Sequence, residues 1–176
     1  MRYLVTGLPR SRTAWFSVLM GCRHEITREL KSFEDLCDKW PDGTGFSDAA
    51  LGFQLKRIVN EIGPRVLIIE RDLEDVQASF LKYMHDVPIR LSVLTEHLEL
   101  LQSRLAEASS VSTPLVRRIR YEALQDLNAV KWAMSWLKPG IDTSRASDVM
   151  RMNVQVDRKY VLEELKADHT GWHVAA

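Results

Sequence analysis

The segment with the most evident chemistry lies near the start of the chain, where two guanidinium groups and two hydroxyl groups stand within four residues. A short apolar run, Tyr3–Thr6, precedes it, Gly7 interrupts that run, and a helical pattern follows from Ser11 to Met20. A strand, a tight loop and a helix start in this order direct backbone N–H groups and the positive helix end toward one point. The segment therefore predicts a site for a phosphate- or sulfate-like anion. Its residues are Pro9, Arg10, Ser11, Arg12, Thr13, Ala14 and Trp15.

The end of this loop bears on the identity of the anion. The Walker A pattern of ATP and GTP hydrolases ends in Gly, Lys and a Ser or Thr whose hydroxyl binds Mg²⁺. Counted from Gly7, the corresponding positions hold Arg12, Thr13 and Ala14. The missing lysine and hydroxyl argue against an ordinary ATP or GTP hydrolase, and we expect no metal. For this segment taken alone, a plain strand-to-helix corner with both arginines in solvent is the alternative.

A second arginine and hydroxyl follow the run Arg65–Glu70, whose continuous apolar stretch predicts a strand covered on both faces. Arg71 stands directly after this run, where open α/β sheets bind their ligands. A helical pattern starts at Asp72, and two helical turns lead to Ser79. The guanidinium of Arg71 and the hydroxyl of Ser79 could therefore reach one phosphate group. The alternative is that Arg71 pairs with Asp75 or Glu74 at the surface and that Ser79 has no role.

These two segments resemble the two signatures of the P-loop sulfotransferase superfamily. The first signature is a strand followed by Pro, Lys or Arg, Ser, Gly, Thr, Thr and often Trp, and Pro9–Trp15 matches it at five of seven positions, with departures at Arg12 and Ala14. The second signature has an Arg, then Asp and Val, and a Ser eight positions after the Arg. It is matched by Arg71, Asp75, Val76 and Ser79.

The resemblance implies a donor nucleotide, 3′-phosphoadenosine 5′-phosphosulfate (PAPS), and the product 3′,5′-adenosine bisphosphate, with no metal. In the family, the first signature binds the 5′-phosphosulfate end and the second binds the 3′-phosphate. The residues implied in donor binding are therefore Pro9, Arg10, Ser11, Arg12, Thr13, Ala14, Trp15, Arg71 and Ser79.

Sulfuryl transfer also needs a base for the acceptor's proton and a cation for the charge on the leaving oxygens. Arg10 is the expected cation. The stretch around Glu25 resembles the Glu-Glu-Thr-Arg segment of the protein-tyrosine sulfotransferases, whose first Glu is the base, so Glu25 is the first candidate and His24 the second. Ion pairing of Glu25 with Arg28 is the alternative role of that carboxylate. Arg28 and Asp48 are candidates for acceptor contacts, although Asp48 also suits a helix cap.

Strand patterns alternate with helix patterns along the chain, which predicts an α/β domain with a mainly parallel sheet. With the resemblance, this gives a single three-layer α/β/α P-loop nucleotide-binding domain over residues 1–176. The expected strands cover 3–6, 22–26, 45–48, 65–70, 115–121 and 153–156. The expected helices cover 11–20, 33–40, 48–62, 72–84, 88–109, 124–136 and 157–167.

The helix expected over 88–109 carries leucines at steps of three and four, from Leu91 to Leu105. This stripe favours packing on its own domain, and a homodimer seam along Leu91–Leu105 is the alternative.

Composition limits the partners. The formal net charge is zero, so we expect neither nucleic acid nor a membrane surface as partner. Cys22 and Cys37 have no zinc-type spacing, and two reduced thiols together with the absence of a leader or an apolar span predict a cytoplasmic protein.

The sequence is compatible with three functions. The first is a sulfotransferase that transfers a sulfuryl group from PAPS to a hydroxyl or amine of an unknown small-molecule acceptor. The second is a non-catalytic nucleotide-binding or regulatory protein, because Arg12 replaces a glycine in the loop. The third is a small P-loop kinase, against which the missing lysine argues.

Overall fold

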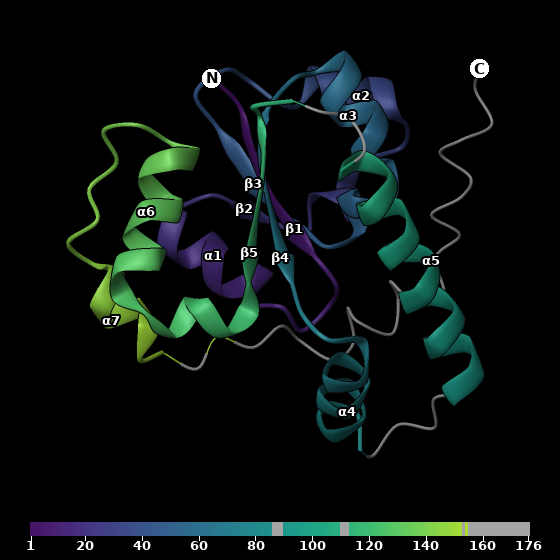
Figure 1. Ribbon diagram of the computed structural model, residues 1–176. Helices are drawn as coiled ribbons and strands as arrows, with labels where there is room; N and C mark the ends of the chain where they lie inside the picture. The colour runs from purple at the N-terminus through teal and green to yellow at the C-terminus, as the bar shows by residue number, and fades with distance from the viewer. Residues whose placement is uncertain (86–89, 110–112, 153, 155–176) are drawn as a thin grey trace.

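The computed structural model describes residues 1–85, 90–109, 113–152 and 154, and five strands form one all-parallel sheet in the order β2-β3-β1-β4-β5 (Figure 1). The two inner strands β1 and β4 pair over their whole length, from Tyr3 beside Arg65 to Gly7 beside Ile69. The first five of the six expected strands are confirmed, although the second is only two residues long. Their bounds are Tyr3–Gly7 (β1), Arg23–His24 (β2), Gly45–Ser47 (β3), Arg65–Glu70 (β4) and Val116–Arg120 (β5).

The helices follow the expected pattern, with four differences. The helices expected over 48–62 and 124–136 are each replaced by a 3-10 helix followed by an α-helix, and the short helices Ile26–Glu29 and Ala146–Met150 were not expected. The α-helices are Thr13–Met20 (α1), Phe33–Asp38 (α2), Leu55–Glu61 (α3), Leu73–Tyr83 (α4), Leu91–Ser109 (α5), Leu127–Leu137 (α6) and Ala146–Met150 (α7). The 3-10 helices are Ile26–Glu29 (η1), Ala50–Gln54 (η2) and Tyr121–Gln125 (η3).

The expected strand 153–156 and helix 157–167 lie outside the described residues, apart from Val154, which is in no regular element. The same holds for Pro88, the expected first residue of α5.

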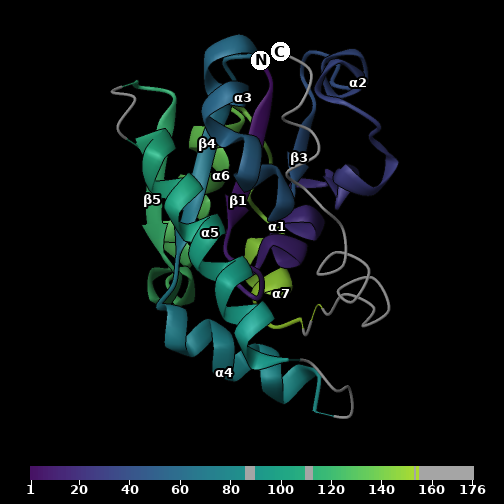
Figure 2. The same ribbon diagram turned by 90° about the vertical axis from the view of Figure 1, so that its right-hand side faces the viewer.

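Helices cover both faces of the sheet, which gives a three-layer α/β/α arrangement (Figures 1 and 2). Alternate residues of β4 belong to two different cores, because side chains alternate across a strand. Val66 and Ile68 pack with α2, α3, α4 and α5, whereas Leu67 and Ile69 pack with α1, α6 and α7. The inner strands are therefore buried on both faces, as their apolar sequence predicts.

The leucine stripe of α5 packs on its own domain. Leu94, Leu98, Leu101 and Leu105 are all buried in the core, while Leu91 is exposed. Helix α5 packs closely against η2 because Gly52 in η2 has no side chain. A Cβ at this position would lie 2.7 Å from Leu101 Cδ1 of α5. The homodimer along Leu91–Leu105 stays a prediction.

The connections make the loop after β1 and the loop after β4 diverge. The chain leaves β1 toward α1 on one face of the sheet, and it leaves β4 toward α4 and α5 on the other face (Figure 1). Open parallel sheets form a ligand crevice at such a reversal, beyond the carboxyl ends of the strands. The fold thus brings the segments after Gly7 and after Glu70, which are neighbouring strand ends, to one place.

Candidate functional site

The loop between β1 and α1 has a backbone shape that suits anion binding. Arg10 and Arg12 both have left-handed backbone conformations, with φ angles of 65° and 67°. Alternation of left-handed and ordinary residues turns successive N–H groups to one side of a loop. The backbone N–H of Ser11 donates to Leu8 O at 3.2 Å and closes the loop. Arg12 precedes α1 and makes no side-chain cap, so the first N–H groups of the helix face the loop.

Gly7 allows the loop to leave β1 beside β4. A Cβ at this position would lie 2.5 Å from the backbone oxygen of Ile69. The glycine is therefore required by the close approach of the two strands at the point where the loop begins.

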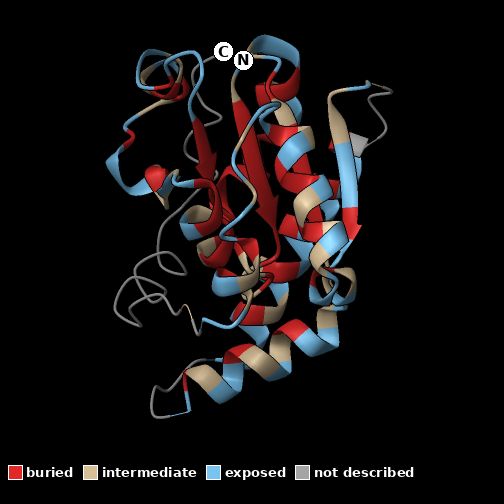
Figure 3. Cartoon of the chain, turned by 90° about the vertical axis from the view of Figure 1, so that its left-hand side faces the viewer, coloured by how far each residue is buried: buried red, intermediate tan, exposed pale blue. Residues whose placement is uncertain are grey.

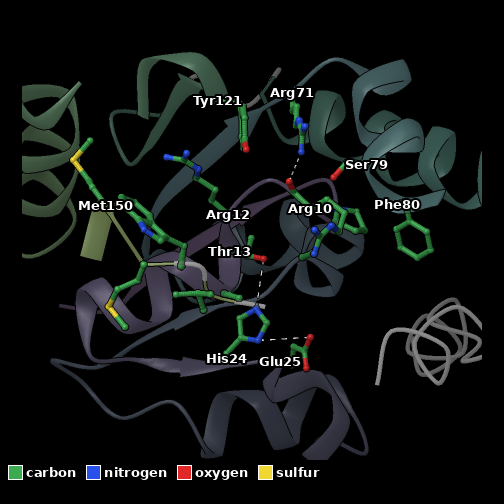
Figure 4. A pocket seen from close by; sticks show the side chains of 16 residues that line it. Arg10, Arg12, Thr13, His24, Glu25, Arg71, Ser79, Phe80, Tyr121 and Met150 are labelled. Carbon is green, nitrogen blue, oxygen red and sulfur yellow. Dashed lines mark hydrogen bonds and ion pairs between the residues drawn. The ribbon is translucent and has the colours of Figure 1, made fainter. Parts of the chain in front are cut away.

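A cavity of about 240 Å³ opens at these strand ends (Figure 4). The described residues around it come from the β1–α1 loop, from the ends of β2, β4 and β5, and from α4 and α7. Its polar and charged side chains are those of Arg10, Arg12, Thr13, His24, Glu25, Arg71, Ser79 and Tyr121. Pro9, Ala14 and Trp15 also line it, whereas Ser11 lies just behind, fully buried, and its Oγ has no hydrogen-bond partner among the described residues.

Arg71 connects the two predicted binding segments. Its Nη1 donates to the backbone oxygen of Arg10 at 2.5 Å, and its guanidinium lies over the Tyr121 ring, 4.1 Å from the ring centre. No carboxylate of the described residues pairs with Arg71, and its buried Nε has no hydrogen-bond partner in that part of the chain. A half-buried cation held in this way, without an anion, is a strong feature of an anion site.

Arg10 adds a second positive charge close by. Its guanidinium lies 4.3 Å from the centre of the Tyr83 ring at the end of α4. Burial lowers the pKa of Arg10 from its usual value, and the nearby charge of Arg71 also lowers it. Both effects disfavour the charged form, and a bound anion between these two residues would offset them.

Arg12 is directed away from the centre of the loop. Its Nη1 donates to the backbone oxygen of Leu124 at 3.0 Å, and its guanidinium lies 5.1 and 5.3 Å from the ring centres of Tyr121 and Trp15. The left-handed backbone at this position explains why glycine would suit it. The side chain forms one wall of the cavity and does not cross the loop (Figure 4).

Figure 4 shows Arg71, Tyr121 and Ser79 on one side of the cavity and His24 and Glu25 on the opposite side. Ser79 reaches this place because α4 begins directly after Arg71, where the Asp72 side chain accepts a hydrogen bond from Glu74 N at 2.9 Å and caps the helix. The two predicted binding segments and the predicted base therefore line one cavity.

The His24 and Glu25 side chains form a small acid–base cluster at the end of β2. Glu25 pairs with Arg28, with 2.5 Å between Oε2 and Nη2, and its Oε1 lies 3.6 Å from His24 Nδ1. Burial raises the pKa of Glu25 to about 7; Arg28 opposes this shift, and the Asp48 carboxylate adds to it. Burial also lowers the pKa of His24, so this imidazole is mainly neutral near pH 7.

Asp48 lies behind this cluster and not at the cavity. Its carboxylate is fully buried, accepts hydrogen bonds from the backbone and hydroxyl of Thr27, both at 3.0 Å, and accepts one from Ala50 N at 2.8 Å. It therefore joins the first N–H group of η2 to η1, and through η1 it positions Glu25. Arg28, the other residue predicted to contact the acceptor, forms an ion pair with Glu25.

Sequence reasoning gave Tyr121 no part in binding. The parallel register sets Glu70 beside Arg120, so the residues that follow, Arg71 and Tyr121, are also neighbours. The aromatic residue at the end of β5 was therefore a usable signal. Met150, in the unexpected helix α7, also lines the cavity, and no pattern in the sequence indicated it.

Comparison of the chain with family models, with curated proteins and with solved structures finds no match in any of the three. In the described part of the chain, no helix is long and apolar enough to cross a membrane. Across residues 1–85, 90–109, 113–152 and 154, no three His, Cys, Asp or Glu side chains are grouped so that they could hold a metal ion.

Proposed function

We propose that this protein is a sulfotransferase that uses PAPS and transfers its sulfuryl group to a hydroxyl or amine acceptor. The observation that carries the proposal is the arrangement of two cationic points around one cavity. One is the Arg10 loop with the start of α1, and the other is Arg71 with Ser79 (Figure 4). A ligand with phosphate-like groups at two ends matches such a pair.

The residues present fit the donor in their hydrogen-bonding capacity. The buried Nε of Arg71 and the buried Oγ of Ser11 have no hydrogen-bond partner among the described residues, and each can donate to a phosphate or sulfate oxygen. In this assignment, Arg71 and Ser79 hold the 3′-phosphate, and the loop from Arg10 to Trp15 holds the 5′-phosphosulfate end.

Glu25 is the base in this proposal. The bound donor supplies an activated sulfuryl group and a phosphate oxygen as leaving group. Glu25 accepts the proton of the acceptor's hydroxyl or amine, and a carboxylate with a pKa of about 7 suits this task near neutral pH. Arg10 and the N–H groups at the start of α1 stabilise the negative charge that develops on the leaving oxygen. His24, 3.6 Å from Glu25, orients the carboxylate.

The experiment is transfer of ³⁵S from labelled PAPS to a panel of phenols, alcohols, amines and tyrosine peptides. We expect label transfer by the natural chain and a loss of at least about 100-fold with Glu25→Gln, the lower end of the range for a single general base. Glu29→Gln is the matched control, since Glu29 is an exposed carboxylate of the same turn that pairs with Arg23.

A second function has one observation in its favour. Glu25, the expected base, forms an ion pair with Arg28, which disfavours its acceptance of a proton. This arrangement fits a protein that binds the nucleotide without turning it over. Tight binding of 3′,5′-adenosine bisphosphate without label transfer to any acceptor would support this function over the enzyme.

A further inference from the structure

In the described part of the chain, β5 is an edge strand of the sheet and pairs with no strand other than β4. The amide of Val66 in β4 donates to the Leu115 carbonyl at 2.7 Å. Because N–H and C=O groups alternate in direction along a strand, the groups of Val116, Arg118 and Arg120 point away from β4. Figure 3 shows β5 as a largely exposed strand beside the buried inner strands. Such an edge can accept another strand.

The same edge carries a dense positive charge. Three of the five residues of β5 are arginines, and all three are exposed. Arg118 is paired with Glu70, but Arg117 and Arg120 form no ion pair with a carboxylate of the described residues. The chain as a whole has no net charge, so this local excess favours an acidic partner.

A cavity of about 510 Å³ lies beside this edge, between α5 and the carboxyl end of β4. Arg118 lines it, together with Glu70, Glu99 and Leu105. Side chains alternate along β5, so Arg120 belongs to the same face as Arg118. A strand added to β5 would place every second side chain toward this groove and toward these two cations.

The opposite face beside β5 is apolar and aromatic. Trp132 and Trp136 stack with 6.4 Å between ring centres, and Trp132 is 47% exposed. The guanidinium carbons of Arg117 and Arg65 lie 6.0 and 5.8 Å from the centre of the Trp136 ring. The other half of the side chains of an added strand would meet this apolar surface.

We propose that the β5 edge binds an extended peptide segment of a partner protein that alternates acidic and apolar residues, by strand addition. The acidic side chains meet Arg118 and Arg120, the apolar ones meet Trp136, and the backbone extends the sheet. A second copy of this chain fits less well, because two β5 strands would set their arginines against each other.

The test uses the full chain and a fluorescein-labelled peptide with four Glu-Val repeats, with fluorescence anisotropy as the readout. Two control peptides keep its composition: a block peptide of four Glu followed by four Val, and a Glu-Val peptide N-methylated at every residue. The protein variants are Arg118→Glu/Arg120→Glu, which reverses the two cations of the groove face, and the control Lys56→Glu, an exposed cation on α3. Arg120→Gln is a milder variant in case the double variant unfolds.

We expect saturable, salt-sensitive binding of the alternating peptide. The double variant should lower the affinity for this peptide by ~10-fold or more, on the order of 1.4 kcal/mol. Arg120→Gln should lower the affinity by a measurable part of this amount, and Lys56→Glu should not change it. Neither control peptide should bind comparably. Equal binding of the block or methylated peptide, no effect of the arginine variants, or no peptide binding would overturn the proposal. Binding of oligodeoxythymidine in place of the peptide would assign this surface to single-stranded nucleic acid and overturn it as well.

Discussion

The replacement Glu25→Gln separates the role of this residue in stability from its role in catalysis. The folded protein raises the pKa of Glu25 from 4.5 to about 7, chiefly by burial. The folded state therefore holds the proton more tightly than the unfolded state, and the contribution of the protonated carboxyl is lost as pH rises from 4.5 toward 7. At 1.36 kcal/mol per pH unit, the loss reaches at most about 3.4 kcal/mol, and partial exposure of the side chain reduces it to about 2 kcal/mol.

Glutamine imitates the protonated form at every pH. We therefore expect Glu25→Gln to be more stable than the natural chain by about 2 kcal/mol at pH 8, a shift in Tm of about 4–8 °C, and to differ little at pH 4.5. Thermal unfolding followed by circular dichroism at both pH values measures this, with Glu29→Gln as the exposed control. A lower Tm for Glu25→Gln at pH 8 would refute the reasoning, because it would mean that the ion pair with Arg28 outweighs burial.

The remaining predictions concern the loop. Gly7→Ala should lower the free energy of unfolding by about 2–3 kcal/mol in urea titration, because the new methyl group would meet Ile69 O at 2.5 Å; an unchanged midpoint would show that the strands can separate. Ser11→Ala should leave the free energy of unfolding unchanged or raise it by about 1 kcal/mol, because the buried Ser11 hydroxyl has no partner among the described residues. The same variant should bind 3′,5′-adenosine bisphosphate about 3- to 10-fold more weakly, as measured by calorimetry. Unchanged nucleotide affinity would remove Ser11 from the site. Arg12→Gly should change the unfolding free energy by no more than about 1 kcal/mol, because relief of the left-handed backbone offsets the lost bond to Leu124; a loss of several kcal/mol would give Arg12 a larger structural role.

Much of the fold could be predicted from local patterns. The continuous apolar run over Arg65–Glu70 predicted a buried parallel strand, which the structure has as β4. The stripe on α5 was correctly assigned to packing on its own domain. These features depend on residues close in sequence or on periodicity, which a single sequence records directly.

The arrangement of the site was only partly predictable. Parallel strand ends meet at one edge, so the proximity of Arg10 and Arg71 followed from the two motifs. The ring of Tyr121 beneath Arg71 depends on the pairing of β5 with β4, which no local pattern fixes. Asp48 illustrates the opposite case: a carboxylate after a strand suggested an acceptor contact, but tertiary packing buries it against Thr27.

Calorimetric titration of 3′,5′-adenosine bisphosphate tests the central claim most directly. We predict one binding site per chain without Mg²⁺, and a loss of affinity of about 10- to 100-fold for Arg71→Ala, the cost of one charge-assisted phosphate contact. Arg104→Ala is the matched control, because Arg104 lies on α5 and pairs with Glu107 away from the cavity. Absence of binding, or equal affinity of the natural chain and Arg71→Ala, would contradict the assignment of this cavity to the donor nucleotide.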